Sequence, residues 1–200
     1  MLKDKKTTVK IACIGDSVTY GSKLRNRIKE CYPECLQALL GRKYRTMNFG
    51  LSGATINPNG DIPYISSIEY KKSLDFKPDL VIMQFGGNDS KKHNYKGTEL
   101  FKNEYLKLMN SYKLINKDVL FIIILPVPIY HELWGVQTKI LNGEITITLE
   151  DIILDNNIPF VDPKPSFSNR MELYDVDEIH PNKDGAQILA ELVLKEAIKL

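Results

Sequence analysis

The sequence has little of what marks a disulfide-rich, membrane-spanning or nucleic-acid-binding protein. It contains three cysteines, an odd number, which disfavours a disulfide framework and predicts free thiols at Cys13, Cys31 and Cys35. No run reaches the ~18 apolar residues that a membrane span requires. The formal charge is only +2 and the basic residues are spread thinly, so no basic stripe predicts binding to nucleic acid. Neutral or weakly acidic small molecules fit better as partners.

Signatures of cofactor and metal sites are also missing. The chain has neither the GxxxxGK[ST] phosphate loop nor the GxGxxG dinucleotide fingerprint. Its three histidines are scattered, and no Cys/His cluster has the spacing of zinc ligands. We therefore predict no cofactor and no metal. The first ten residues pass from charge directly into a strand without a secretory apolar region, which predicts a cytoplasmic protein.

The sequence predicts one domain over residues 1–200, because no linker-like stretch or shift in composition divides it. Short apolar segments are predicted to be buried strands. There are five of them, at residues 9–14, 44–49, 79–85, 119–125 and 158–162. Helical patterns separate the strands, which predicts a parallel sheet covered on both faces, a three-layer α/β/α fold.

Several helix boundaries carry signals of their own. Pro33 suits the first turn of one helix and Gly41 its C-terminal cap, while Thr98 and Asn182 are predicted to cap two later helices. Residues 145–149 alternate as a strand would, but the wider apolar spacing fits a helix, and parallel strands require crossovers. We therefore predict a helix there. The polar, turn-rich residues 54–63 are predicted to form an irregular loop beside the site, with a weak helical pattern after them.

The stretch VKIACIGDSVTY, residues 9–20, places Ser17 directly after the first predicted strand. Ligands of an open parallel sheet gather beyond the carboxyl ends of its strands, so this hydroxyl is well placed for chemistry. The alternative is that Asp16 and Ser17 only form a turn or a helix cap. An α/β-hydrolase elbow is excluded, because G-x-S-x-G would need glycine where the chain has Thr19.

A serine needs a base before it becomes a good nucleophile, and an imidazole held by a carboxylate is the usual one. Asp177 and His180 supply both groups within one turn of chain, with Asp175 as the competing acid. His93 and His131 are predicted to be surface histidines, since their loops lack an acid at that spacing.

The negative intermediate of ester cleavage needs hydrogen-bond donors aimed at its oxygen. Gly53 offers a backbone N–H, Asn88 a side-chain amide, and Ser17 its own N–H. The alternatives are that Gly53 and Gly86 are turn glycines and that Asn88 caps a loop.

In combination these motifs resemble the SGNH hydrolases, also called GDSL esterases and lipases. Gly15-Asp16-Ser17 resembles the first block of that family, Gly53 the second, the sequence from Gly86 to Asp89 the third, and the sequence from Asp177 to His180 the last. The blocks follow the family's order over nearly the whole chain, and Val18 stands where the consensus has Leu. The resemblance implies a flavodoxin-like α/β fold, a catalytic set of Ser17, Gly53, Asn88, Asp177 and His180, and hydrolysis of carboxylic esters through an acyl-serine.

Within the family, the GDSVTYG, NFGLSGAT and HPNKDG stretches look most like small acetylesterases acting on decorated carbohydrates, including sialate O-acetylesterase-like proteins. The resemblance therefore predicts an acetylated carbohydrate as substrate. A thioesterase or lysophospholipase-type acyl hydrolase is the alternative within the class. A catalytically silent carbohydrate-binding domain is the alternative from another class.

Overall fold

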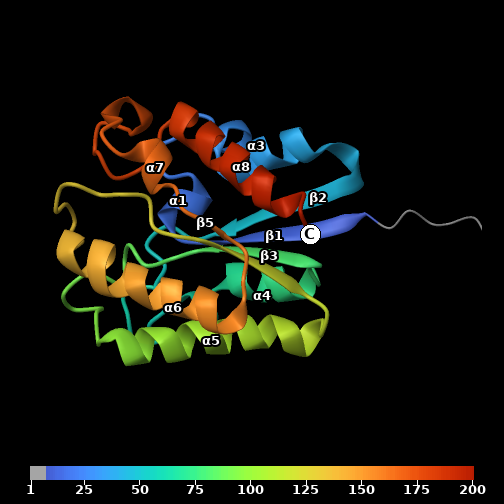
Figure 1. The fold of residues 1–200 in the computed structure, drawn as a ribbon, viewed down its shortest axis with the longest axis horizontal. Coiled ribbons are helices and arrows are strands. Elements are labelled where there is room, and N and C mark those ends of the chain that lie inside the picture. Colours follow the sequence, from blue (N-terminus) through green and yellow to red (C-terminus); the bar gives the residue numbers. More distant parts are fainter. Residues whose placement is uncertain (1–7) are drawn as a thin grey trace, which may run out of the picture.

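A computed structural model describes residues 8–200, which form a five-stranded parallel sheet with helices on both faces (Figure 1). The strands are β1 (Val9–Gly15), β2 (Tyr44–Gly50), β3 (Leu80–Gln84), β4 (Leu120–Ile124) and β5 (Phe160–Val161). Their order across the sheet is β2-β1-β3-β4-β5, and every neighbouring pair is parallel. The three-layer α/β/α prediction is confirmed. The prediction of one domain over residues 1–200 stays a prediction.

The longer helices divide between the two faces of the sheet. Helices α3 and α8 lie on one side, and α4, α5 and α6 lie on the other (Figure 1). The α-helices are α1 (Ser17–Tyr20), α2 (Arg27–Glu30), α3 (Tyr32–Leu40), α4 (Ile68–Asp75), α5 (Thr98–Ile115), α6 (Thr146–Asn156), α7 (Lys164–Phe167) and α8 (Lys183–Ala197). The 3-10 turns are η1 (Gly41–Lys43), η2 (Tyr64–Ser66) and η4 (Met171–Leu173), and η3 (Ile140–Ile145) is a π-helical turn.

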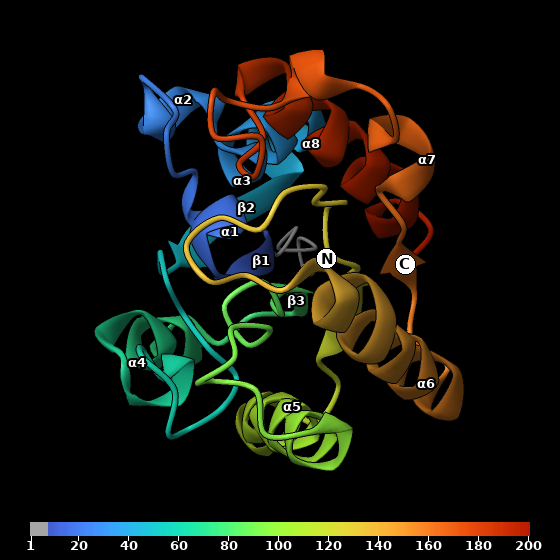
Figure 2. The same cartoon turned by 90° about the vertical axis from the view of Figure 1, so that its left-hand side faces the viewer.

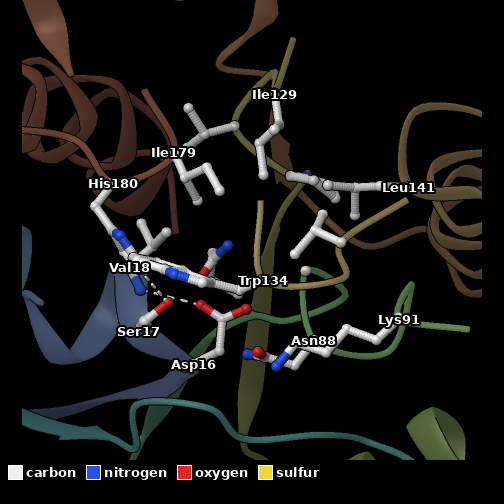
Figure 3. A pocket seen from close by; sticks show the side chains of 15 residues that line it. Asp16, Ser17, Val18, Asn88, Lys91, Ile129, Trp134, Leu141, Ile179 and His180 are labelled. Carbon is white, nitrogen blue, oxygen red and sulfur yellow. Dashed lines mark hydrogen bonds between the residues drawn. The ribbon is translucent and has the colours of Figure 1, made fainter. Parts of the chain in front are cut away.

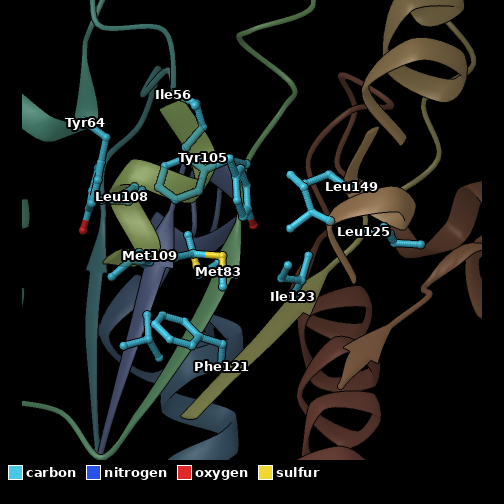
Figure 4. Close-up of a cluster of buried hydrophobic side chains, with 14 of the residues drawn as sticks. Ile56, Tyr64, Met83, Tyr105, Leu108, Met109, Phe121, Ile123, Leu125 and Leu149 are labelled. Atoms are coloured by element: carbon cyan, nitrogen blue, oxygen red, sulfur yellow. The ribbon is translucent and has the colours of Figure 1, made fainter. Parts of the chain in front are cut away.

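Side chains of the central strands alternate between two cores, as the period of two along a strand requires. In β1, Ile11 and Cys13 pack against α3 and α8, whereas Ala12 and Ile14 face the opposite core. Figure 4 shows that second core, where strand residues meet side chains of α5 and α6. Each fully buried aliphatic or aromatic side chain contributes ~1.5–3 kcal/mol to folding. Both faces of the strands are buried, which explains why they read as continuous apolar runs.

Most helix predictions hold, and one cap prediction is wrong. Asn182 caps α8 by accepting the N–H groups of Asp184 and Gly185. Residues 146–156 are helical, as chosen over the strand alternative. Thr98, however, is the first residue of α5 and makes no capping hydrogen bond, because Gly97, with φ 94°, occupies the cap position. A glycine tolerates that left-handed backbone at little cost.

The sheet order places β1 next to both β2 and β3, so the chain reverses its winding direction at β1. In doubly wound folds the crevice at such a switch point is where ligands bind.

The three cysteines are free thiols, as predicted. No helix among residues 8–200 has the length and apolarity to cross a membrane. The prediction made for the first ten residues falls mostly on residues 1–7, outside the described range.

Candidate active site

Ser17 begins helix α1, directly beyond the carboxyl end of β1. The preceding Asp16 is the N-cap, and its carboxylate accepts the N–H of Val18 at 3.0 Å. The predicted alternative of a helix cap is therefore true of Asp16. Helix α1 packs so closely on β2 that a Cβ at Gly50 would lie 2.3 Å from the backbone nitrogen of Tyr20. This close approach fixes the backbone of Ser17 at the edge of the sheet.

Ser17, His180 and Asp177 form one chain of hydrogen bonds, and Figure 3 shows its Ser17 and His180 members. The Oγ of Ser17 lies 2.8 Å from Nε2 of His180, and Nδ1 of the same ring lies 2.8 Å from Oδ2 of Asp177. His180 and Asp177 are both buried. The two partners are separated from the serine by more than 160 residues of sequence and meet it only through the fold.

The carboxylate of Asp177 is held by three donors. Its Oδ1 accepts the backbone N–H groups of Ile179 and His180, and its Oδ2 faces the imidazole. Burial raises the pKa of Asp177, but the hydrogen bonds together lower it by more than burial raises it. The pKa of Asp177 therefore lies below its ordinary value. Among residues 8–200, the carboxylate of the competing acid, Asp175, accepts only the N–H of the adjacent Val176 and makes no hydrogen bond to the His180 imidazole.

Asn88 lies in the loop that follows β3, in the same pocket as Ser17 and His180. Its backbone carbonyl accepts a hydrogen bond from the amide of Asn94, and Asn57 holds the carbonyl of Asn94 in turn. Its side-chain amide makes no hydrogen bond to any residue between 8 and 200. The loop-cap alternative therefore does not describe this side chain, which stays available to a ligand. The next residue, Asp89, does tie loops together, since it accepts the N–H groups of Ile56 and Asn57.

Gly53 lies in the loop after β2 and is not among the residues that line this pocket. Ser52 beside it is joined to Ser22 by a 3.0 Å hydrogen bond, which holds this loop against the end of α1. Gly53 has φ 85° and Gly86 has φ 126°, so both glycines do occupy turn conformations. The N–H groups of Gly53 and Ser17 have no acceptor among residues 8–200. Their predicted role as donors to a ligand stays a prediction.

A pocket of about 60 Å³ opens beside Ser17 (Figure 3). Its polar part is formed by Asp16, Ser17, Asn88 and His180, with Lys91 at the edge. Its apolar part comes from the segment after β4 and from the start of the next helical region. Those apolar residues are Pro126, Val127, Ile129, Trp134, Val136 and Leu141.

Two carboxyl groups near Ser17 are buried, Asp16 in the lining of the pocket and Asp89 in the loop that carries Asn88. Burial raises the pKa of Asp16 to about 7, and the nearby Asp89 raises it further, while the Val18 and Gly87 N–H groups and the charge of Lys91 oppose the rise. Burial likewise raises the pKa of Asp89 to about 6, against its hydrogen bonds from Asn57 and Ile56. Removing a carboxylate from water disfavours its charged form, so burial favours the neutral form of both groups.

The other two histidines are exposed, as predicted. His93 pairs with Asp61 and His131 with Glu178, each at 2.8 Å. Both acids come from distant segments, so spacing along the chain gave no sign of them. No group of three or more His, Cys, Asp or Glu side chains within residues 8–200 is arranged to hold a metal ion.

Reasoning from sequence missed the apolar lining of the pocket and Lys91. Residues 127–135 follow the fourth predicted strand, and no sequence pattern indicates that this segment reaches Ser17. Nor does any motif mark Ile129 or Leu141 as part of a site. Only the sheet order and the path of this loop bring them to the site.

A serine, a histidine and a carboxylate joined in this order are the arrangement of a serine hydrolase. Residues 13–188 match the GDSL-like Lipase/Acylhydrolase family, and the chain belongs to this family. Membership of this family supports the carboxylic ester hydrolase that the sequence predicts.

Comparisons with individual proteins agree with this assignment. An acetylxylan esterase of Xylanibacter ruminicola is 28% identical across 94% of this chain and 43% of that protein. The chain thus spans less than half the length of this relative.

Two solved structures share the fold. The lipase/acylhydrolase from Enterococcus faecalis has a TM-score of 0.76 at 20% identity, covering 94% of each chain. A carbohydrate acetylesterase family member from Sinorhizobium meliloti has a TM-score of 0.72 at 16% identity, covering 96% of this chain and 98% of that one.

Proposed function

We propose that the protein removes O-acetyl groups from carbohydrates through an acyl-Ser17 intermediate. The observation that carries the proposal is the continuous chain of hydrogen bonds from Asp177 through His180 to Ser17. Ser17 and His180 also line a small pocket. Asp177 holds the proton of His180 on Nδ1, so Nε2 is free to accept the proton of the serine hydroxyl.

In the first half of the reaction, Oγ of Ser17 attacks the ester carbonyl carbon while its proton passes to Nε2 of His180. The carbonyl oxygen becomes an oxyanion, which the amide of Asn88 and the N–H groups of Gly53 and Ser17 stabilise. When the intermediate collapses, the bond to the alcohol oxygen breaks and His180 gives its proton to that oxygen. The alcohol leaves and an acyl-Ser17 ester remains.

In the second half, a water molecule takes the place of the alcohol. His180 removes one proton from the water, and the resulting hydroxide attacks the acyl carbon. The same donors hold the second oxyanion. Its collapse releases the carboxylic acid and returns the proton from His180 to Ser17, so the enzyme is restored without a further reactant.

The dimensions of the pocket support acetyl as the acyl group. A volume of about 60 Å³ holds only a few water molecules, at ~10–15 Å³ each. An acetyl group fits such a space, whereas an octanoyl chain exceeds it. The likeness to an acetylxylan esterase supports a carbohydrate as the alcohol portion. The pocket size also argues against a long-chain thioesterase or lysophospholipase, and the complete set of contacts argues against a silent binding domain.

A graded panel of substrates tests the proposal. The wild type and Ser17→Ala would be assayed on p-nitrophenyl esters from acetyl to octanoyl and on acetylated xylo-oligosaccharides. We expect the specificity constant to fall with chain length and acetate to be released from the oligosaccharides, with no turnover by the variant. Preference for octanoyl esters, or no release of acetate from any saccharide, would contradict the proposal.

A further inference from the structure

The loop between β4 and η3 passes across the carboxyl end of the sheet (Figure 2). Val127 and Ile129 point toward the small pocket, and both are buried. Further along, Trp134 lines the same pocket but is 56% exposed. A large indole left this open beside a reactive serine is available to contact a ligand.

The position of Trp134 is fixed by its neighbours and its backbone. Its ring centroid lies 5.6 Å from that of His180, and the Nζ of Lys23 lies 5.3 Å from the indole centroid. The loop is tied to the turn that carries His180 by the 2.8 Å ion pair between His131 and Glu178. Trp134 itself has φ 52°, a left-handed conformation that is strained for a bulky residue. The fold thus holds the indole beside the base despite a local cost.

This position determines which part of an ester the indole meets. His180 must give its proton to the alcohol oxygen, so that oxygen comes within hydrogen-bond reach of Nε2. The carbon skeleton attached to the oxygen then lies beside the ring that contacts His180. Trp134 therefore faces the alcohol portion of the substrate, whereas the pocket walled by Ile129 and Leu141 faces the acyl portion.

A second hollow includes Lys23, the neighbour of Trp134, and most of its lining residues are charged or polar. It has a volume of about 330 Å³, within the ~300–1,000 Å³ typical of ligand sites. It is lined by Lys23, Leu24, Arg25, Glu30, Asp175, Asn182 and Lys183. Lys23 belongs both to this hollow and to the face of Trp134, and Asp175 donates its N–H to the carbonyl of His180. Two lining residues therefore connect the hollow to the site, Lys23 through the indole of Trp134 and Asp175 through the backbone of His180.

Resting on the proposed function, we propose that Trp134 and this polar hollow form a saccharide subsite. The C–H face of the sugar that bears the acetyl group packs on the indole, and the neighbouring saccharide units place their hydroxyls against the charged lining. The chemistry of the hollow favours this occupant, because a lipid alcohol would need a continuous apolar surface, and six of the seven lining residues are charged or polar.

The chain offers a direct binding signal, because Trp134 is its single tryptophan. Acetylated xylo-oligosaccharides would be titrated into Ser17→Ala while the intrinsic fluorescence is recorded. We expect a saturable change in intensity or wavelength. An unchanged spectrum at concentrations above the wild-type KM would overturn the proposal.

Steady-state kinetics on two substrates distinguish a role of Trp134 in binding the saccharide from a general role of its loop in the active site. We expect Trp134→Ala to lower kcat/KM for acetylated xylo-oligosaccharides at least ~tenfold, mainly through KM, the equivalent of ~1.4 kcal/mol. Its loss on p-nitrophenyl acetate should be clearly smaller than its loss on the oligosaccharides, and Trp134→Phe should retain most of the oligosaccharide activity. In the hollow, Arg25→Ala should raise KM for the oligosaccharides alone.

The matched control is Tyr130→Ala, because Tyr130 is a similarly exposed aromatic residue of the same loop that lines a different hollow. We expect it to leave both activities unchanged. Equal losses on both substrates in folded Trp134→Ala, or no loss on either, would refute the subsite and leave the proposed function standing. If the wild type cleaves p-nitrophenyl acetate but no acetylated saccharide, the proposed function fails together with the subsite.

Discussion

Replacing Asp177 by asparagine should reverse the proton arrangement of His180 without removing any side-chain volume. Oδ1 of an asparagine can still accept the N–H groups of Ile179 and His180, because those two bonds need only an oxygen. The amide NH₂ then faces Nδ1 of His180 in place of Oδ2. An N–H donor at that position favours an unprotonated Nδ1, which moves the ring proton to Nε2.

The proton on Nε2 would then be donated toward Ser17, so the imidazole could no longer accept the serine proton. The expected loss in kcat is ~10⁴, the size seen when a triad aspartate becomes an amide, or ~5 kcal/mol of transition-state stabilisation. Steady-state kinetics on p-nitrophenyl acetate, with thermal melting as the folding check, would measure it. Asp175→Asn is the matched control, and we expect it to be nearly as active as the wild type. A folded Asp177→Asn enzyme within about tenfold of wild-type kcat would refute the reasoning.

Other expectations concern the donors, the acyl pocket and the buried carboxyls. Asn88→Ala should lower kcat by ~10²–10³ with little change in melting temperature, because its amide is free for the transition state; a normal kcat would remove it from the catalytic set. Ile129→Ala should raise the ratio of butyryl to acetyl ester activity, and an unchanged ratio would mean that this residue does not bound the acyl group. The contribution of Asp16 to the free energy of unfolding should fall as the pH rises from about 4 to about 7, because folded Asp16, with its pKa raised to about 7, keeps a proton that the unfolded chain releases. Asp16→Asn preserves the helix cap and should weaken this dependence in urea unfolding at pH 5 and 8; identical slopes would contradict the burial argument.

Short-range signals in the sequence were sufficient for much of the fold. The central strands β1, β3 and β4 are largely buried on both faces, so each appears as an apolar run. Asn182 was identifiable as a cap because its side chain acts on the next three residues. Thr98 was misassigned because the choice between Gly97 and Thr98 depends on a left-handed backbone angle that composition does not reveal.

Some residues of the candidate site were likewise predictable from local sequence, whereas others depend on the fold. Asp177 and His180 interact within one turn of chain, so their spacing was informative. Whether Ser17 reaches them depends on the parallel order of the sheet, and the four motifs in sequence order predicted it only through the resemblance to a family. The lining of the acyl pocket and the place of Trp134 depend on the path of a loop with no repeating pattern, and no local signal predicted them.

Covalent labelling tests the central claim most directly. The wild type would be treated with an alkyl phosphonate that reacts with activated serines, and the modified residue located by peptide mass spectrometry. In the wild type we expect one phosphonylated residue, Ser17. Labelling should be abolished in Ser17→Ala and strongly slowed in His180→Ala. Modification of another residue, or undiminished labelling of folded Ser17→Ala, would contradict it.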